Sequence, residues 1–170
     1  WEKTPIAGLL IHSPKVFSDE RGYFLERFRT LQHPELPIQF PQINQSRSVP
    51  RVLRGLHIQM NPMQAKFVSV IRGRIWDVAV DLRKNSSTFG KQFALELNDT
   101  KNQMLWIPEG FAHGFCVIGD EPADVIYFTS SIYTPTTDRG IRWNDSHFRI
   151  SWPVQEPRSE ERRVGKECRS

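Results

Sequence analysis

Three polar side chains stand among short apolar runs, and their types are suited to proton transfer. Arg54, His57 and Lys66 lie in the stretch V-L-R-G-L-H-I-Q-M-N-P-M-Q-A-K-F-V-S-V-I. If all three line one pocket, the two cations favour the neutral imidazole, which can then act as a general base. A structural histidine that bonds only to the backbone is equally compatible with the spacing.

Elements with strand-like patterns follow these residues directly. The runs F-V-S-V-I and I-W-D-V-A-V-D alternate between apolar and other side chains, as half-buried strands do. We therefore expect the polar groups to project from a rigid sheet.

Over the whole chain, about eight to ten short strands recur at roughly 10 to 15 residue spacing, and no amphipathic helix is longer than about two turns. This pattern predicts an all-β fold, a β-sandwich or jelly roll with short helical turns. Residues 30–41 carry three prolines and are predicted to form a loop with at most one helical turn. We expect a single domain over residues 1–157, followed by a tail at 158–170 whose mixed charges predict disorder or a non-native origin.

Composition limits the classes of function. The net charge of +4 permits an anionic ligand, but the basic residues are scattered among acids and form no nucleic-acid motif. A small phosphorylated ligand fits this charge better. No apolar run approaches the roughly 18 residues of a membrane span, and Cys116 and Cys168 are too few for a disulfide framework. We therefore expect a cytoplasmic protein with no nucleic-acid or membrane partner.

A second histidine follows the turn P-E-G-F-A. His113 resembles the second histidine of cupin folds, where P-x-G-x-x-H supplies a metal ligand. Such sites also need an H-x-H pair, whereas His57 is followed by Ile58 and Gln59. Because one imidazole is missing, three protein ligands are hard to assemble, and no metal is predicted.

Several other side chains have two possible interpretations. A buried Asp77 or Asp81 needs a partner, which is either a histidine that it orients or an arginine with which it pairs. We favour a histidine as the partner of Asp77. For Asp81 we favour an arginine, which would be Arg72, Arg74 or Arg83. Tyr127 and Tyr133 are core residues or, facing a pocket, proton donors. Gln42 and Asn44 share one face of an extended segment and either contact ligand oxygens or hold loops.

The N-terminal part predicts a hairpin. A turn at Asp19 to Gly22 separates two short strands, and Arg21 and Glu26 bracket the aromatic pair Tyr23 and Phe24. This hairpin is either the rim of a ligand site or a solvated turn. Elsewhere no G-x-S-x-G elbow, phosphate-binding glycine loop or dinucleotide fingerprint is present, which disfavours acyl transfer and redox chemistry.

Six motifs together resemble the dTDP-4-dehydrorhamnose 3,5-epimerase family. They are R-G-L-H, Q-A-K-F-V, D-V-A-V-D-L-R, S-S-T-F-G, I-P-E-G-F-A-H-G-F and D-R-G-I-R-W, and the resemblance extends from about residue 6 to residue 157. It implies a metal-free cupin jelly roll without a cofactor, a homodimer with exchanged N-terminal strands, and a thymidine diphosphate sugar as substrate.

The resemblance also assigns roles to residues. It implies that His57 is the general base, Tyr127 the opposing acid and Lys66 the group that stabilises an enolate. Asp77 would orient His113. It further implies substrate contacts at Arg54, His113, Gln42, Asn44, Asp138 and Tyr133, and, from a partner chain near the nucleotide, at Arg21, Glu26, Phe17 and Phe24.

One segment departs from the family pattern. The family pairs its catalytic histidine with an aspartate in a C-terminal S-x-x-D segment, whereas Ser159 is followed here by Glu160, Glu161 and Arg162. The expectation is a less well oriented imidazole and a slower enzyme, unless Glu160 or Glu161 substitutes. An epimerase acting at carbon 3 or carbon 5 alone, and a sugar-binding cupin without catalysis, remain as alternatives.

Overall fold

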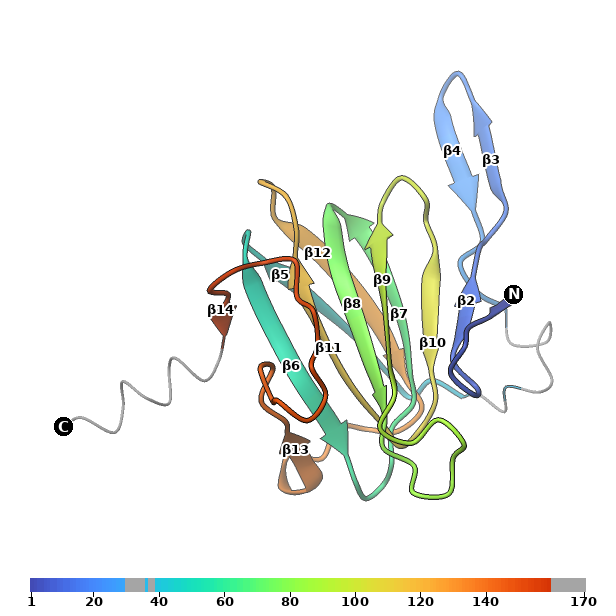
Figure 1. Ribbon diagram of the computed structural model, residues 1–170. Coiled ribbons are helices and arrows are strands. Elements are labelled where there is room, and N and C mark those ends of the chain that lie inside the picture. Colours follow the sequence, from blue (N-terminus) through green and yellow to red (C-terminus); the bar gives the residue numbers. More distant parts are fainter. Residues whose placement is uncertain (30–35, 37–38, 160–170) are drawn as a thin grey trace.

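Short strands pair into two facing antiparallel sheets in the computed structural model, which describes residues 1–29, 36 and 39–159 (Figure 1). The first sheet has the strand order β1 (Glu2–Lys3), β2 (Leu10–His12), β10 (Met104–Ile107), β7 (Lys66–Arg72), β12 (Ala123–Thr129) and β5 (Gln42–Ser48). The second has the order β13 (Asp138–Gly140), β6 (Val52–Gln59), β11 (Phe111–Val117), β8 (Arg74–Asp81) and β9 (Gln92–Asn98), and β14 (Arg158–Ser159) pairs with β6 in parallel.

The connections identify the topology. From β5 to β12 the chain crosses between the sheets at every step except β8 to β9, which pair within one sheet. The resulting orders β5-β12-β7-β10 and β6-β11-β8-β9 are those of a jelly roll. The predicted fold class is therefore confirmed, and one short 3-10 turn, η2 (Pro135–Thr137), precedes β13.

The apolar core occupies only part of the space between the sheets. Its main cluster includes Val68 and Val70 of β7, Ile75 of β8 and Leu105 of β10, all fully buried. Among the described residues, neither β5 nor β6 contributes to this cluster. The sheets are thus filled with apolar side chains on one side and open between β5 and β6, where polar residues line a cleft.

A second apolar cluster covers the outer face of the β6 sheet. Leu56, Val78 and Ala112 are buried there beneath side chains of the segment after β13, including Phe148 and Trp152. This cover leaves the inner face of β6 as the side available to a ligand.

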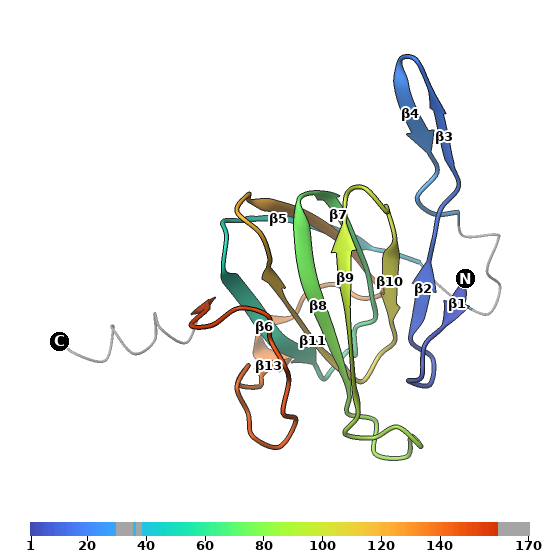
Figure 2. The ribbon, with the colours of Figure 1, turned by 45° about the horizontal axis from the view of Figure 1, so that its top comes forward.

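The predicted N-terminal hairpin is present and extends away from the sandwich (Figures 1 and 2). It consists of β3 (Val16–Asp19) and β4 (Gly22–Leu25). Its aromatic side chains are exposed, with Phe17 at 53%, Tyr23 at 58% and Phe24 at 70%.

Two details differ from the sequence-based expectation. The described residues contain fourteen strand elements rather than eight to ten, because very short strands such as β1 carry too few residues for a periodic pattern. The first two residues of the tail predicted at 158–170 form β14. Most of the loop predicted at 30–41, and residues 160–170 of the tail, lie outside the described residues.

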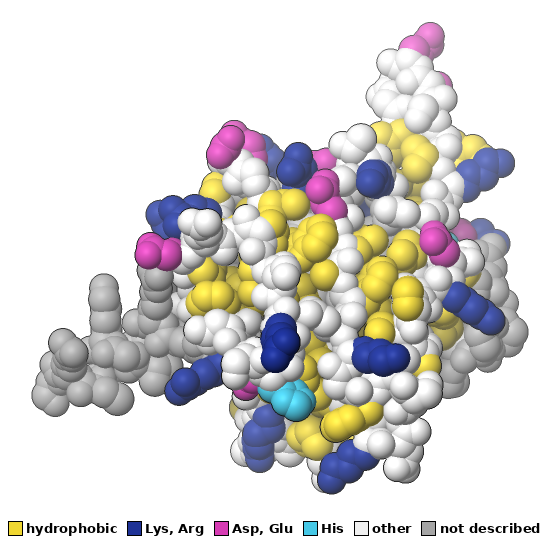
Figure 3. Space-filling view, in the orientation of Figure 1, with side chains coloured by type: hydrophobic (Ala, Val, Ile, Leu, Met, Phe, Trp, Pro, Cys, Tyr) yellow, Lys and Arg dark blue, Asp and Glu magenta, His cyan; other side chains and the backbone are white. Residues whose placement is uncertain are grey.

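The surface agrees with the scattered charge of the sequence. On the face drawn in Figure 3, Lys and Arg side chains are dispersed among acidic and apolar ones. Within the described residues, no helix has the length and apolar character needed to cross a membrane.

Candidate functional site

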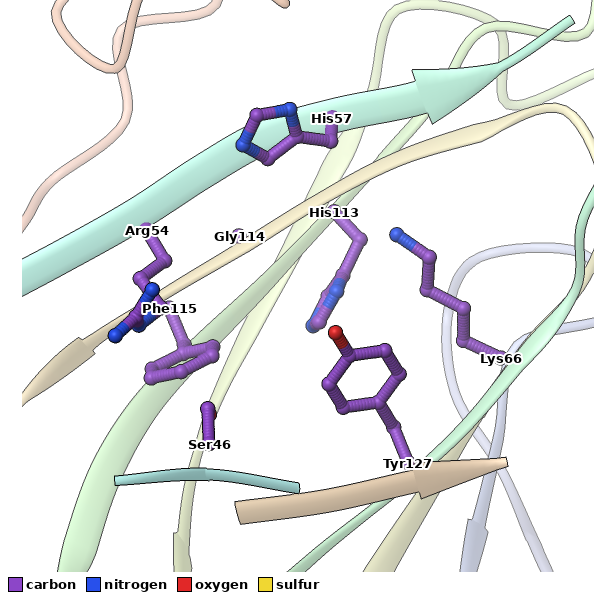
Figure 4. A pocket seen from close by; sticks show the side chains of 8 residues that line it. All are labelled: Ser46, Arg54, His57, Lys66, His113, Gly114, Phe115 and Tyr127. Atoms are coloured by element: carbon purple, nitrogen blue, oxygen red, sulfur yellow. The ribbon is translucent and has the colours of Figure 1, made fainter. Parts of the chain in front are cut away.

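The cleft between the sheets consists of two connected cavities. The inner cavity, of about 150 Å³, is lined by Ser46, Arg54, His57, Lys66, His113, Gly114, Phe115 and Tyr127 (Figure 4). The outer cavity, of about 380 Å³, is lined by Gln42, Asn44, His57, Gln59, Gln64, Lys66, Tyr127, Tyr133 and Asp138. Because His57, Lys66 and Tyr127 line both cavities, they stand at the junction.

Close packing of two strands sets the position of both histidines. His57 on β6 faces His113 on β11, and the register then shifts so that Arg54 faces Phe115. Such a bulge re-aims the neighbouring side chains. Gly55 makes it possible, because its φ is +97° and a Cβ there would lie 2.6 Å from the carbonyl oxygen of His113. Only glycine permits this approach without a backbone shift.

The opposite wall comes from the other sheet. Lys66 on β7 pairs with Thr129 of β12, and Tyr127 lies two residues from Thr129 on the same face. Figure 4 shows the Tyr127 hydroxyl and the Lys66 ammonium directed into the space that separates them from His57. An imidazole and a phenol therefore lie on opposite sides of one cavity, with an ammonium beside it.

Burial changes the acid–base properties of this wall. Burial lowers the pKa of the Lys66 ammonium, against the opposing effect of the Asp138 and Asp77 carboxylates. Burial also raises the pKa of the Tyr127 phenol; the cation of Arg54 acts to lower it and Asp138 acts to raise it. Tyr127 thus keeps its proton at neutral pH and can donate it.

A buried carboxylate holds His113. Its Nε2 lies 3.1 and 3.0 Å from the two carboxylate oxygens of Asp77, and both side chains are almost completely buried, at 8% and 0% exposure. The structure thus brings together the pair that the sequence suggested. Asp81 instead accepts hydrogen bonds from Arg83, at 2.9 and 2.7 Å, as the sequence favoured.

A second carboxylate approaches the other histidine. Oδ2 of Asp138 lies 3.6 Å from Nδ1 of His57 and accepts a hydrogen bond of 3.2 Å from the Tyr133 hydroxyl. The sequence had suggested that His57 lacks a supporting carboxylate because the tail motif is altered. Residues 160–162 of that motif lie outside the described residues, so the expectation stays a prediction. The nearby carboxylate of Asp138 comes from β13, a different part of the chain.

Amide side chains organise the outer cavity. Gln42 donates a hydrogen bond of 2.8 Å to the side-chain oxygen of Asn44, so the two share a face as predicted. The side-chain oxygen of Gln42 also accepts the backbone N–H of Tyr133, at 2.8 Å. Arg54 donates to the Ser48 hydroxyl at 2.9 Å, which directs its guanidinium along the cleft.

Four predicted site residues lie apart from this cleft. Phe17, Arg21 and Phe24 line a separate cavity on the hairpin, and Arg21 bonds to the carboxylate of Asp19. Glu26 pairs with Arg29 at the base of the hairpin. Within one chain, these residues do not reach His57.

Sequence reasoning missed several lining residues. Gln59 and Gln64 border the outer cavity, and Ser46 and Phe115 border the inner one. The alternation of strands could have indicated Gln59 and Ser46, which lie two residues beyond His57 and Asn44 on the same faces. Within the described residues, no group of three or more His, Cys, Asp and Glu side chains is arranged to hold a metal ion.

Comparisons with known proteins agree on one family. A family model described as dTDP-4-dehydrorhamnose 3,5-epimerase matches residues 3–167. The dTDP-4-dehydrorhamnose 3,5-epimerase of Shigella flexneri is 48% identical over 159 residues, which cover 91% of this chain and 87% of that protein. The protein of the same description from Methanothermobacter thermautotrophicus is 48% identical over 155 residues, covering 90% and 83%.

A solved structure extends this similarity to three dimensions. The dTDP-6-deoxy-D-glucose-3,5-epimerase of Legionella pneumophila, in complex with dTDP-4-keto-L-rhamnose, aligns with a TM-score of 0.90 and 39% identity. The alignment covers 96% of this chain and 89% of that one.

Proposed function

The chain belongs to the dTDP-4-dehydrorhamnose 3,5-epimerase family, and we propose that His57, Lys66 and Tyr127 carry out its proton transfers. It is an isomerase that inverts carbons 3 and 5 of a dTDP-4-keto-6-deoxy sugar in rhamnose biosynthesis. The observation that carries our assignment is the position of His57 and Tyr127 on opposite walls of one cavity, with Lys66 beside them.

The reaction follows from the chemistry of the ketone. The carbonyl at carbon 4 acidifies the hydrogens on carbons 3 and 5. Neutral His57 removes one of these protons, and the electron pair of the C–H bond moves into an enolate. The Lys66 ammonium stabilises the negative charge on the enolate oxygen.

Inversion requires the new proton to come from the other face. Tyr127 lies opposite His57 and donates its hydroxyl proton to the carbanionic carbon, while His57 retains the proton it removed. Exchange with solvent then restores the phenol and the neutral imidazole. The same cycle at the second carbon completes the reaction, and no oxidant or reductant is consumed.

The other polar residues of the cleft bind the substrate. Arg54 provides positive charge and hydrogen-bond donors at the inner cavity, which His113 also lines, while Gln42 and Asn44 present amides in the outer one. Tyr133 offers an aromatic ring at the mouth, where it is 49% exposed. A flat nucleobase can stack on such a ring.

We further propose that the chain is a homodimer. The projecting β3–β4 hairpin exposes Phe17, Tyr23 and Phe24, and exposed apolar groups of this kind mark interaction sites. A second copy would cover them and bring Arg21 and Glu26 near its nucleotide. Light scattering should therefore give twice the chain mass of 19.8 kDa.

The cytoplasmic location of the protein is likewise a prediction.

Solvent deuterium exchange tests the catalytic assignment. In D2O the wild-type protein should incorporate deuterium at carbons 3 and 5 of the keto sugar, while His57→Asn should lose at least about 100-fold in rate. Circular dichroism and thermal unfolding of the variant would establish that it is folded. A wild-type protein that binds the sugar without exchange would identify a sugar-binding module, and exchange by His57→Asn at the wild-type rate would exclude His57 as the base.

A further inference from the structure

We propose that Asp138 is the positioning residue of the catalytic base: it orients the His57 imidazole and stabilises its protonated form after each proton abstraction. The proposal rests on the proposed role of His57. It also changes the role of Asp138, for which the sequence resemblance implied a contact with substrate.

The register of two strands brings the groups together. Asp138 on β13 lies directly opposite Gln59 on β6, and Gly140 lies opposite His57. His57 and Gln59 are two residues apart and share one face of β6, so the Asp138 side chain is the diagonal neighbour of the imidazole. The separation of 3.6 Å between Oδ2 and Nδ1 follows from this placement.

Hydrogen bonds fix β13 to the strand that carries the base. The backbone N–H of Asp138 donates to the carbonyl of Thr134 at 3.2 Å, and the N–H of Thr134 donates to the side-chain oxygen of Gln59 at 2.7 Å. Gln59 also donates to the carbonyl of Ile132, at 3.1 Å. The loop that leads to Asp138 is therefore bound to Gln59, which lies two residues from His57 on β6.

The charges around His57 give the carboxylate a function. Arg54 and Lys66 face the same cleft, and their positive charges disfavour a positive imidazole. His113, Tyr127 and Tyr133 also line the cleft. Among the described residues that line the cleft, Asp138 is the only acid. Since the base becomes a cation once it accepts a proton, a carboxylate at this distance lowers the free energy of that state.

The Tyr133 hydroxyl further restricts the carboxylate. It donates to the same oxygen, Oδ2, that faces His57. In Asp138→Asn the amide oxygen can still accept from Tyr133, so this substitution removes the charge and keeps an acceptor.

Steady-state kinetics and deuterium exchange on Asp138→Asn test the proposal. We expect kcat to fall about 10- to 100-fold, as when a carboxylate that orients a functional histidine is lost, with KM changed by less than about twofold. The acid limb of the kcat/KM profile should move to lower pH, because the protonated imidazole loses its ion pair with the carboxylate. Asp138→Glu restores the charge and should recover part of kcat and the position of the limb.

Asp120→Asn is the matched control. It removes the same charge from an exposed loop position away from the cleft and should leave kcat and the pH profile unchanged. If Asp138→Asn raises KM while kcat and the acid limb stay at wild-type values, Asp138 is a substrate contact and the proposal is overturned. Failure of the wild-type protein to exchange deuterium would instead refute the proposed function.

Discussion

Two histidine–aspartate pairs border the same cleft and differ in depth. His113 and Asp77 lie 3.0 Å apart, with side-chain exposures of 8% and 0%. His57 and Asp138 lie 3.6 Å apart, with exposures of 37% and 22%. The first pair is almost completely buried, and the second is open to the outer cavity.

The difference in exposure indicates that the His113–Asp77 pair has a structural role and the His57–Asp138 pair a chemical one. A buried polar group that loses its partner costs free energy of folding, so the deep pair is held in one arrangement. A half-exposed pair contributes little to stability, because water screens it. We infer that the open pair serves proton transfer, which requires an imidazole able to gain and lose a proton, and that the deep pair fixes His113 as a rigid contact.

The largest predicted effect concerns Lys66, whose pKa is influenced by the carboxylates of both pairs. Lys66→Met should reduce kcat by about 100- to 1000-fold, since it removes the cation that stabilises the enolate. In the wild type, kcat should fall as pH rises through the lowered pKa of Lys66, so the basic limb should lie below the usual lysine value of 10.5. A basic limb above 10.5 would contradict the assignment.

The same residue links stability to pH. Burial makes the folded chain bind the Lys66 proton less tightly than the unfolded chain does. Stability should therefore rise with pH between the lowered pKa and 10.5, and Lys66→Met should lack this rise. Urea unfolding across this range measures the effect. A variant that loses activity without losing stability would show that Lys66 serves function at a cost to folding.

A smaller predicted effect is a difference between Asp77 and Asp138 in what each carboxylate contributes to the free energy of unfolding. Asp77→Asn should lower the free energy of unfolding by about 1–3 kcal/mol, because it disturbs a buried pair. Asp138→Asn should change it by less than about 0.5 kcal/mol. Urea denaturation of both variants at neutral pH provides the measurement, and equal losses would remove the distinction between the pairs.

Local patterns predicted the parts of the site that lie on regular strands. Alternation predicted the strand that follows Lys66 and the strand that contains Asp77, and both strands formed in the jelly roll. The sequence placed His113 after a turn, and the structure has it within the buried strand β11, which begins at Phe111. These features depend on a few neighbouring residues, so the sequence is sufficient to indicate them.

The contacts that complete the site depend on distant parts of the chain. Asp138 reaches His57 because a three-residue strand pairs with β6, and three residues are too few to show a period. The register shift between His113 and Phe115 likewise depends on how closely Gly55 approaches β11. Neither feature can be read from local composition, because each is a property of the folded sheet.

The hairpin illustrates the opposite situation. Its strands and turn were predicted from the segment around Asp19 to Gly22. The predicted roles of Arg21 and Phe24, in contrast, require the proposed second copy of the chain. The isolated chain therefore gives their conformation, and their function stays a prediction until the assembly is measured.

The central claim is that His57 and Tyr127 act from opposite walls of one cavity. The most direct test uses Tyr127→Phe in D2O, with deuterium incorporation and configuration followed separately at carbons 3 and 5 of the sugar by NMR. His57 remains and can remove and return protons from its own side, so exchange should continue with retained configuration. The yield of inverted sugar should fall about 100-fold or more, because the donor on the opposite wall is gone. Inversion of both carbons at the wild-type rate would show that Tyr127 is not the acid and would contradict the account.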